Sequence, residues 1–190
     1  MGGVPPNSPI FIPGAVLPGL SISLKEDSFL AAHHSVNDSL DNLDRAILHQ
    51  LQQNGRISNS ELAQRINLSP PATHARIKRL EQRGYIRQYA ALLDREAIGY
   101  DMLCFVQISL QLHQPEQVER IRTAIQKMPE VLECYHLTGD FDYLLKVVIK
   151  NRSDLERFVV NRLTPIPGLA RIQTSLVLNE VKSTTVLPVA

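Results

Sequence analysis

The spacing of the hydrophobic residues changes halfway along the chain, and this change constrains the fold more than any other feature of the sequence. Over residues 40–83 apolar side chains recur every three or four positions, as at Leu43, Ile47 and Leu51, which is the spacing of an amphipathic helix. Over residues 104–112 they alternate with polar side chains, as in a half-buried strand. An all-helical part is therefore followed by a part that mixes strands and helices.

Side chains that begin and end helices divide the first part into three short segments. Asp41, Ser58 and Ser69 each precede a helical run, and Asp and Ser side chains accept hydrogen bonds from the free N–H groups of a first helical turn. Glu61 follows Ser58 at the spacing of a capping box, and Gly84 ends the last segment. Two helices joined by a short turn and preceded by a third helix predict a helix-turn-helix.

The second part predicts four strands and two helices. The strands are expected at residues 104–112, 131–138, 143–150 and 169–179. One helix is expected behind Pro115 and the other from Ser153, which is spaced to form a capping box with Glu156. The β-prone residues 85–93 predict a hairpin, or wing, after the helix-turn-helix. The predicted fold class is α+β, with an N-terminal winged helix-turn-helix and a C-terminal ferredoxin-like βαββαβ domain.

These patterns divide the chain into four regions. The regions are a tail at residues 1–39, the winged helix-turn-helix domain at 40–92, a linker at 93–102 and the ferredoxin-like domain at 103–187. The tail is expected to be disordered because its Pro, Gly, Ser and His residues show no sustained period. Five prolines interrupt its first 24 residues, and no basic segment precedes an apolar core. Neither a membrane-spanning helix nor a secretory signal is expected, and a cytoplasmic protein is predicted.

Side chains that commonly hold metals or carry out catalysis are present, but not at the spacing such sites need. The six histidines have no Cys or carboxylate beside them at ligand spacing, so no metal site is predicted. Cys104 and Cys134 lie in apolar, strand-like runs and are expected to be buried free thiols. No phosphate-binding loop, nucleophile elbow or dinucleotide fingerprint occurs. The sequence predicts a protein that is not an enzyme and uses no cofactor.

Positive charge is concentrated in the helical part, although the net charge of the whole chain is only +1. Residues 41–95 carry nine Arg or Lys against five Asp or Glu. Guanidinium groups suit DNA because they stay charged and present a planar fork of donors to phosphates and guanine edges. The alternative is a solvated basic helix face.

Thr73 and Leu80 are expected to face inward on the third helix. The candidate DNA contacts are Arg56, Ser69, Thr73, His74, Arg76, Lys78, Arg79, Arg83 and Arg87.

The turn between the two middle strands is a second candidate site. Asp140 and Asp142 flank Phe141, and strand alternation would point both carboxylates to one side. They form either a solvated acidic turn or an anchor for the ammonium group of a small ligand, whose carboxylate would bind free backbone N–H groups of the turn. The residues alone leave both interpretations open.

Ordered motifs along residues 40–187 resemble the Lrp/AsnC family of transcription regulators. Those of the first part are Gly55-Arg56-Ile57-Ser58-Asn59, Leu68-Ser69-Pro70, Arg79-Leu80-Glu81 and Gly84-Tyr85-Ile86. Those of the second part are Pro129-Glu130-Val131 and Thr138-Gly139-Asp140-Phe141-Asp142-Tyr143-Leu144-Leu145. The chain departs from the family in its long tail and in residues 71–75, which are more polar than is common and bear on which operator is read.

The resemblance implies a sequence-specific DNA-binding transcriptional regulator whose DNA binding or assembly responds to a small effector, usually an amino acid. Effector domains of this family pair through their sheets into dimers, which often assemble into octamers or other higher forms. The implied effector site lies between subunits, at Tyr135, Thr138, Gly139, Asp140, Asp142, Tyr143, Ser175 and Val177. Two alternatives share the fold: a siroheme-decarboxylase-like enzyme of haem biosynthesis, and an architectural DNA-binding protein without an effector.

Overall fold

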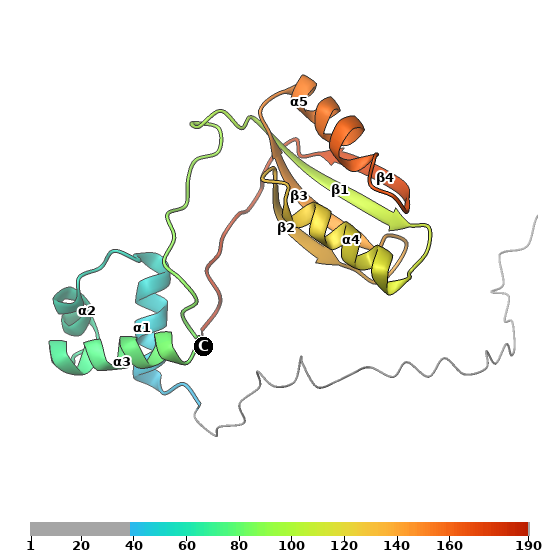
Figure 1. Cartoon of the computed structure of the whole chain (residues 1–190). Helices are drawn as coiled ribbons and strands as arrows, with labels where there is room; N and C mark the ends of the chain where they lie inside the picture. The colour runs from blue at the N-terminus through green and yellow to red at the C-terminus, as the bar shows by residue number, and fades with distance from the viewer. Residues whose placement is uncertain (1–38, 190) are drawn as a thin grey trace, which may run out of the picture. The chain divides into compact units, whose positions relative to one another are not determined.

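The structure is a computed structural model that describes residues 39–189, so the predicted tail at 1–39 lies almost wholly outside the described residues. Three helices come first in the chain and a four-stranded sheet with its own helices follows (Figure 1). No helix of the described part is long and apolar enough to cross a membrane. Over the same residues, no three His, Cys, Asp or Glu side chains gather as a metal site would require.

The first three helices are α1 (Asn42–Gln53), α2 (Asn59–Arg65) and α3 (Pro70–Gln82), in the places that the helical spacing predicts. Ile47, Leu62 and Leu80 are fully buried and form their shared core. Burial of such a stripe, rather than helix propensity, stabilises helices this short. The N-caps Asp41, Ser58 and Ser69 are all confirmed.

The predicted capping box of α2 is only half formed. The Ser58 hydroxyl accepts a hydrogen bond from the Glu61 N–H at 3.1 Å, as predicted. The Glu61 carboxylate turns instead to Arg65, one helical turn later, and pairs with its guanidinium at 2.7 Å. An exposed i,i+4 ion pair therefore replaces the reciprocal half of the box.

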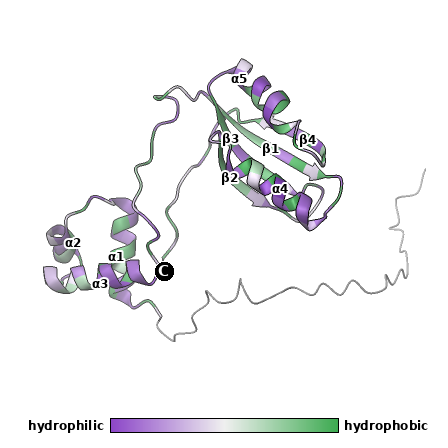
Figure 2. Ribbon diagram, viewed as in Figure 1, coloured by the Kyte–Doolittle hydropathy of each residue, from purple (hydrophilic) through white to green (hydrophobic). Residues whose placement is uncertain are grey.

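The second part folds into one antiparallel sheet in the order β2-β3-β1-β4, which confirms the predicted βαββαβ order. The strands are β1 (Met102–Leu110), β2 (Val131–His136), β3 (Tyr143–Ile149) and β4 (Leu169–Leu176). Figure 2 shows hydrophobic residues along β3, the strand between β2 and β1. The two central strands therefore hold most of the buried side chains of the sheet.

Helices cover one face of this sheet. They are α4 (Pro115–Gln126), α5 (Arg152–Arg157) and a π-helical turn, η2 (Phe158–Leu163), which continues α5. Alternate residues of β1 and β3 form one core with side chains of α4 and η2. The residues between them face away from that core, and Tyr135 on the edge strand β2 is 49% exposed. No helix of the described residues packs on the second face of the sheet.

Two local predictions are wrong. The N-cap of α5 is Asn151, whose side chain accepts from the Asp154 N–H at 3.0 Å, and not Ser153 with Glu156. Both residues are good caps, but the strand ends at Ile149, and Asn151, two residues later, is the first residue after it that can cap a helix well. Cys134 is exposed, because it lies on an edge strand that helices only partly cover, whereas Cys104 is buried as predicted.

The hairpin predicted over residues 85–93 is not formed in the described chain, where this segment has no strand pairing. The hydroxyl of Tyr89 donates instead to the Glu81 carboxylate at 2.9 Å. Burial and this hydrogen bond raise the pKa of Tyr89 to about 12. Leu92 and Leu93 are more than 70% exposed. A β-prone, apolar segment without a pairing strand is left open to solvent.

Candidate DNA-binding and effector sites

One side of α3 is fixed in the domain core. Ser69 caps the helix by accepting from the Ala72 N–H at 3.4 Å, and Pro70 occupies its first position. Thr73 is completely buried, and its hydroxyl donates to the Ser69 carbonyl at 3.1 Å. The structure thus places Thr73 in the core, which corrects its selection as a DNA contact.

Two arginines of α3 bind carboxylates at the start of α1. Arg76 donates to Asp41 at 2.6 Å and to Asp44 at 2.9 Å, and Arg79 donates to Asp44 at 2.6 Å. The Asp44 residue is only 3% exposed, so these ion pairs satisfy a buried carboxylate. Hydrogen bonds to Asp41 and Asp44 raise the pKa of the Arg76 guanidinium. The sequence predicted DNA contacts for both arginines, and the structure gives them a role in holding α3 against α1.

The Asp41 carboxylate is held in its charged form by two hydrogen bonds. The Asp44 backbone N–H donates to Asp41 at 2.7 Å, and Asp41 also receives the Arg76 guanidinium. These two hydrogen bonds lower the pKa of the Asp41 carboxyl. Asp41 and Asp44 form a capping box at the start of α1, and the sequence analysis did not anticipate their pairing with α3.

The outward face of α3 carries the remaining candidates. His74, Ala75 and Lys78 are exposed, and within the described residues Lys78 makes no ion pair. The other exposed candidates are Arg56, Ser69, Arg83 and Arg87. A helix that exposes a lysine and a histidine between flanking arginines has the charge distribution of a DNA-binding helix.

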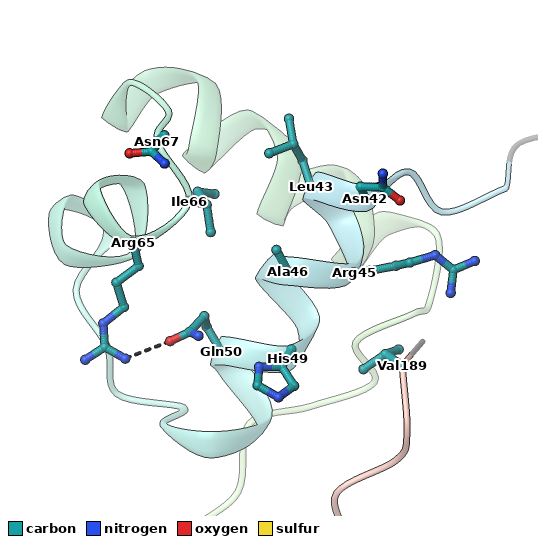
Figure 3. Close-up of a pocket in the computed structure, with 10 residues that line it drawn as sticks. All are labelled: Asn42, Leu43, Arg45, Ala46, His49, Gln50, Arg65, Ile66, Asn67 and Val189. Carbon is teal, nitrogen blue, oxygen red and sulfur yellow. Dashed lines mark hydrogen bonds between the residues drawn. The ribbon is translucent and has the colours of Figure 1, made fainter.

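A cavity of about 500 Å³ lies beside α1, away from the residues that the sequence selected (Figure 3). Gln50 and Arg65 point toward each other across it and are hydrogen-bonded at 2.7 Å. Val189 also lines this cavity, because the C-terminal segment reaches α1. There the Gln52 amide donates to the Leu187 carbonyl at 3.1 Å and accepts from the Leu187 N–H at 2.6 Å. No sequence pattern indicated this contact.

The turn after β2 is held by one of its two acidic residues. Asp142 accepts from the Leu110 N–H at 2.7 Å and contacts His113 Nε2 at 2.7 Å. Burial acts to raise the pKa of Asp142, but the hydrogen bonds from His113 and Leu110 outweigh it and leave this pKa lowered. The Asp142 N–H donates to the Ile108 carbonyl at 2.8 Å. Asp142 therefore binds the end of β1, and its partner His113 was missed.

The exposed part of the turn has unused donors. Thr138, Gly139 and Asp140 are exposed, and their backbone N–H groups have no partner among the described residues. Gly139 has a φ of 117°, a conformation that favours glycine. Successive free N–H groups beside a free carboxylate can bind both charges of a zwitterion.

The other predicted effector residues are not gathered at this turn. Tyr143 is 2% exposed and stacks on His136 with ring centroids 4.9 Å apart, so it is a core residue. Ser175 pairs with Phe105, three positions along β1 from Ile108, and Val177 lies still further from the turn. The exposed Tyr135 donates to Glu133 at 2.6 Å. Within one protomer, the turn and the β4 candidates are separate.

Replacing Asp142 by Ala should destabilise the second part by about 1–3 kcal/mol, because the buried Leu110 N–H and the His113 ring lose their hydrogen-bond partner. Because the pKa of Asp142 is lowered in the folded protein, its ionised carboxylate stabilises the fold at pH values above 3.8, the ordinary pKa of the group. This stabilisation is lost as the pH falls through the lowered pKa. The difference in unfolding free energy between Asp142→Ala and the wild type should therefore reach its full value at pH 7 and disappear in acid. Urea unfolding at a series of pH values measures it. Asp140→Ala is the control, and an equal loss there would contradict this role of Asp142.

Models of known families match both parts of the chain. Residues 40–87 match the winged helix-turn-helix DNA-binding model, and residues 103–187 match the Lrp/AsnC ligand-binding domain. The leucine-responsive regulatory protein of Escherichia coli K12 is 42% identical over 143 residues, which are 75% of this chain and 87% of that protein.

Solved structures of similar proteins share the fold. A transcriptional regulator of Neisseria meningitidis in complex with L-methionine is 40% identical, with a TM-score of 0.76 over 79% of this chain and 97% of that chain. A feast or famine regulatory protein of Mycobacterium tuberculosis complexed with L-methionine is 32% identical, with a TM-score of 0.69 over 76% and 96% of the two chains.

Proposed function

The chain belongs to the Lrp/AsnC family of DNA-binding transcriptional regulators, and from this premise we propose that a free amino acid controls its DNA binding or assembly. The observation that carries the proposal is the turn at Thr138–Asp140, which offers free N–H donors beside a free carboxylate. An α-amino acid has the complementary pair of charges. The two relatives complexed with L-methionine support the same ligand class.

The DNA-facing residues follow from exposure on α3. We propose that His74 and Lys78 reach base edges in the major groove, while Arg56, Arg83 and Arg87 contact phosphates. Arg76 and Arg79 act indirectly, by fixing the angle of α3 against α1. Such a protein works in the cytoplasm, bound to the nucleoid.

The two acidic residues of the turn have different roles in this proposal. Asp142 is occupied by Leu110 and His113, so the ammonium of the ligand falls to Asp140. The carboxylate of the ligand accepts hydrogen bonds from the N–H groups of Thr138 and Gly139. A subunit boundary at this exposed turn would exclude water and strengthen both interactions.

An oligomer supplies that boundary. The helix-free face of the sheet and the unpaired segment with Leu92 and Leu93 are surfaces that a partner could cover, and both leucines are more than 70% exposed. We propose that two protomers pair through these surfaces and that dimers assemble further, as in an octamer. Light scattering coupled to gel filtration measures the subunit number, and a monomer at micromolar concentration would contradict this assembly.

A thermal-shift screen of the twenty amino acids tests the effector. A ligand that binds only the folded state stabilises it by about 2.7 kcal/mol at a hundredfold excess over its dissociation constant. At least one amino acid should therefore raise the melting temperature, and Asp140→Ala should abolish that rise. Asp101→Ala, which removes an exposed carboxylate elsewhere, is the matched control. If no amino acid raises the melting temperature, the protein is an effector-independent architectural DNA binder.

A further inference from the structure

An arginine of the last strand lies against the aromatic residue of the effector turn. Arg171 is an exposed residue of β4, and its guanidinium carbon lies 5.0 Å from the centre of the Phe141 ring. Arg171 Nη2 donates to Gln173 Oε1 at 3.0 Å, and no carboxylate of the described residues pairs with the guanidinium. The ring and the hydrogen bond thus hold a positive charge at the turn, with N–H donors still available.

A second contact joins the same strand position to the turn. Arg171 pairs with Ser109 across β4 and β1, so the two side chains lie on the same face of the sheet. The Ser109 hydroxyl donates to the Asp140 carbonyl at 3.1 Å. Asp140 carries the carboxylate that we assign to the ammonium of the effector, and Phe141 follows it directly in the chain. Arg171 is therefore a neighbour of the proposed effector site.

The acidic residues of the turn leave the charge of Arg171 unneutralised. Asp142 is occupied by the Leu110 N–H and by His113. The Asp140 carboxylate forms no ion pair within the part of the chain that the structure describes. The turn and its neighbour thus offer backbone N–H donors, one carboxylate and one guanidinium to a ligand. An amino acid with an uncharged side chain has charges for only the first two.

We propose that Arg171 selects the side chain of the effector, and that the effector is an acidic L-amino acid, aspartate or glutamate. This inference rests on the proposed function, because the turn binds the α-ammonium and the α-carboxylate as described above. The side-chain carboxylate of the ligand accepts N–H groups from the planar fork of Arg171, which Phe141 supports. An apolar side chain at this place would remove water from the guanidinium and offer it no partner.

Calorimetric titration of the full chain with L-aspartate, L-glutamate, L-glutamine and L-methionine tests this selection. The wild type should bind one of the two acidic amino acids at least about 10-fold more tightly than glutamine or methionine, because hydrogen bonds between charged groups are the stronger ones. Arg171→Gln should weaken binding of that acid by about 10- to 100-fold and leave glutamine and methionine nearly unchanged. Arg171→Lys keeps the charge without the planar fork and should recover part of the affinity. Arg120→Gln removes an exposed arginine of α4 and should change none of the four affinities.

The outcomes separate this inference from the proposed function. If an uncharged amino acid binds best, and its binding is lost in Asp140→Ala but kept in Arg171→Gln, the effector turn stands and selection by Arg171 is overturned. Equal weakening of all four amino acids in Arg171→Gln would also overturn it, because the arginine would then bind the α-carboxylate or support the turn. If no amino acid binds, the proposed function fails and this inference fails with it. Arg171 is exposed, so Arg171→Gln should melt at the temperature of the wild type.

Discussion

An Asp44→Ala variant should lose about 2–3 kcal/mol of unfolding free energy, near the low end of what breaking a buried ion pair costs. Its carboxylate receives both Arg76 and Arg79, and the residue is 3% exposed. The two arginine side chains are 25% and 38% exposed, so they can recover part of their hydration once the partner is gone. The first helix would also lose half of its capping box.

Asp41→Ala separates the ion pairs from the cap. Its side chain is 49% exposed, and Asp44 keeps both arginines in this variant. The loss should be about 1 kcal/mol, the usual cost of removing an N-cap. Urea unfolding of the full chain followed by circular dichroism at 222 nm measures both variants. Equal losses in the two would mean that the buried network does not hold α3.

Lys78→Ala should reduce affinity for a specific operator by roughly 1–3 kcal/mol of binding free energy if the lysine reads a base, without a change in stability. If Lys78 instead contacts a phosphate, the loss is the same on every duplex and the salt slope falls by about one unit. Either result assigns the exposed face of α3 to DNA. Fluorescence anisotropy with labelled operator DNA at several salt concentrations distinguishes them.

Two further variants make this result specific. Arg76→Ala should weaken DNA binding together with stability, since the arginine holds Asp41 and Asp44. Lys127→Ala removes an exposed lysine from the other part of the chain and should change neither property. DNA binding that survives Lys78→Ala and His74→Ala together would place the interface elsewhere.

Short sequence patterns predicted the helices and strands because the interactions that form these elements join residues close together in the sequence. A cap such as Asp41 satisfies N–H groups three residues away, and alternation along β1 reports which side chains meet the core. The same information places Asn151 and Ser153 almost equally well as caps. The end of β3, which depends on strand pairing, decides between them.

The site residues were harder to predict because their partners are far away in the sequence. Arg76 and Arg79 look like DNA contacts until Asp44, more than 30 residues earlier, is placed against them. Asp142 looks like a ligand anchor until His113 reaches it from the loop after β1. Charge patterns show which residues are basic or acidic, but only the tertiary contacts show which charges remain free.

The most direct test of an amino-acid-responsive regulator is an anisotropy titration of the DNA upstream of its own gene with the wild-type chain. The protein should prefer this DNA over a shuffled duplex of equal composition, and log affinity should fall linearly with log salt. The amino acid with the largest thermal shift should change the dissociation constant at least about fivefold, the lower range of allosteric coupling. The same affinity for both duplexes, unaltered by every amino acid, would contradict the account.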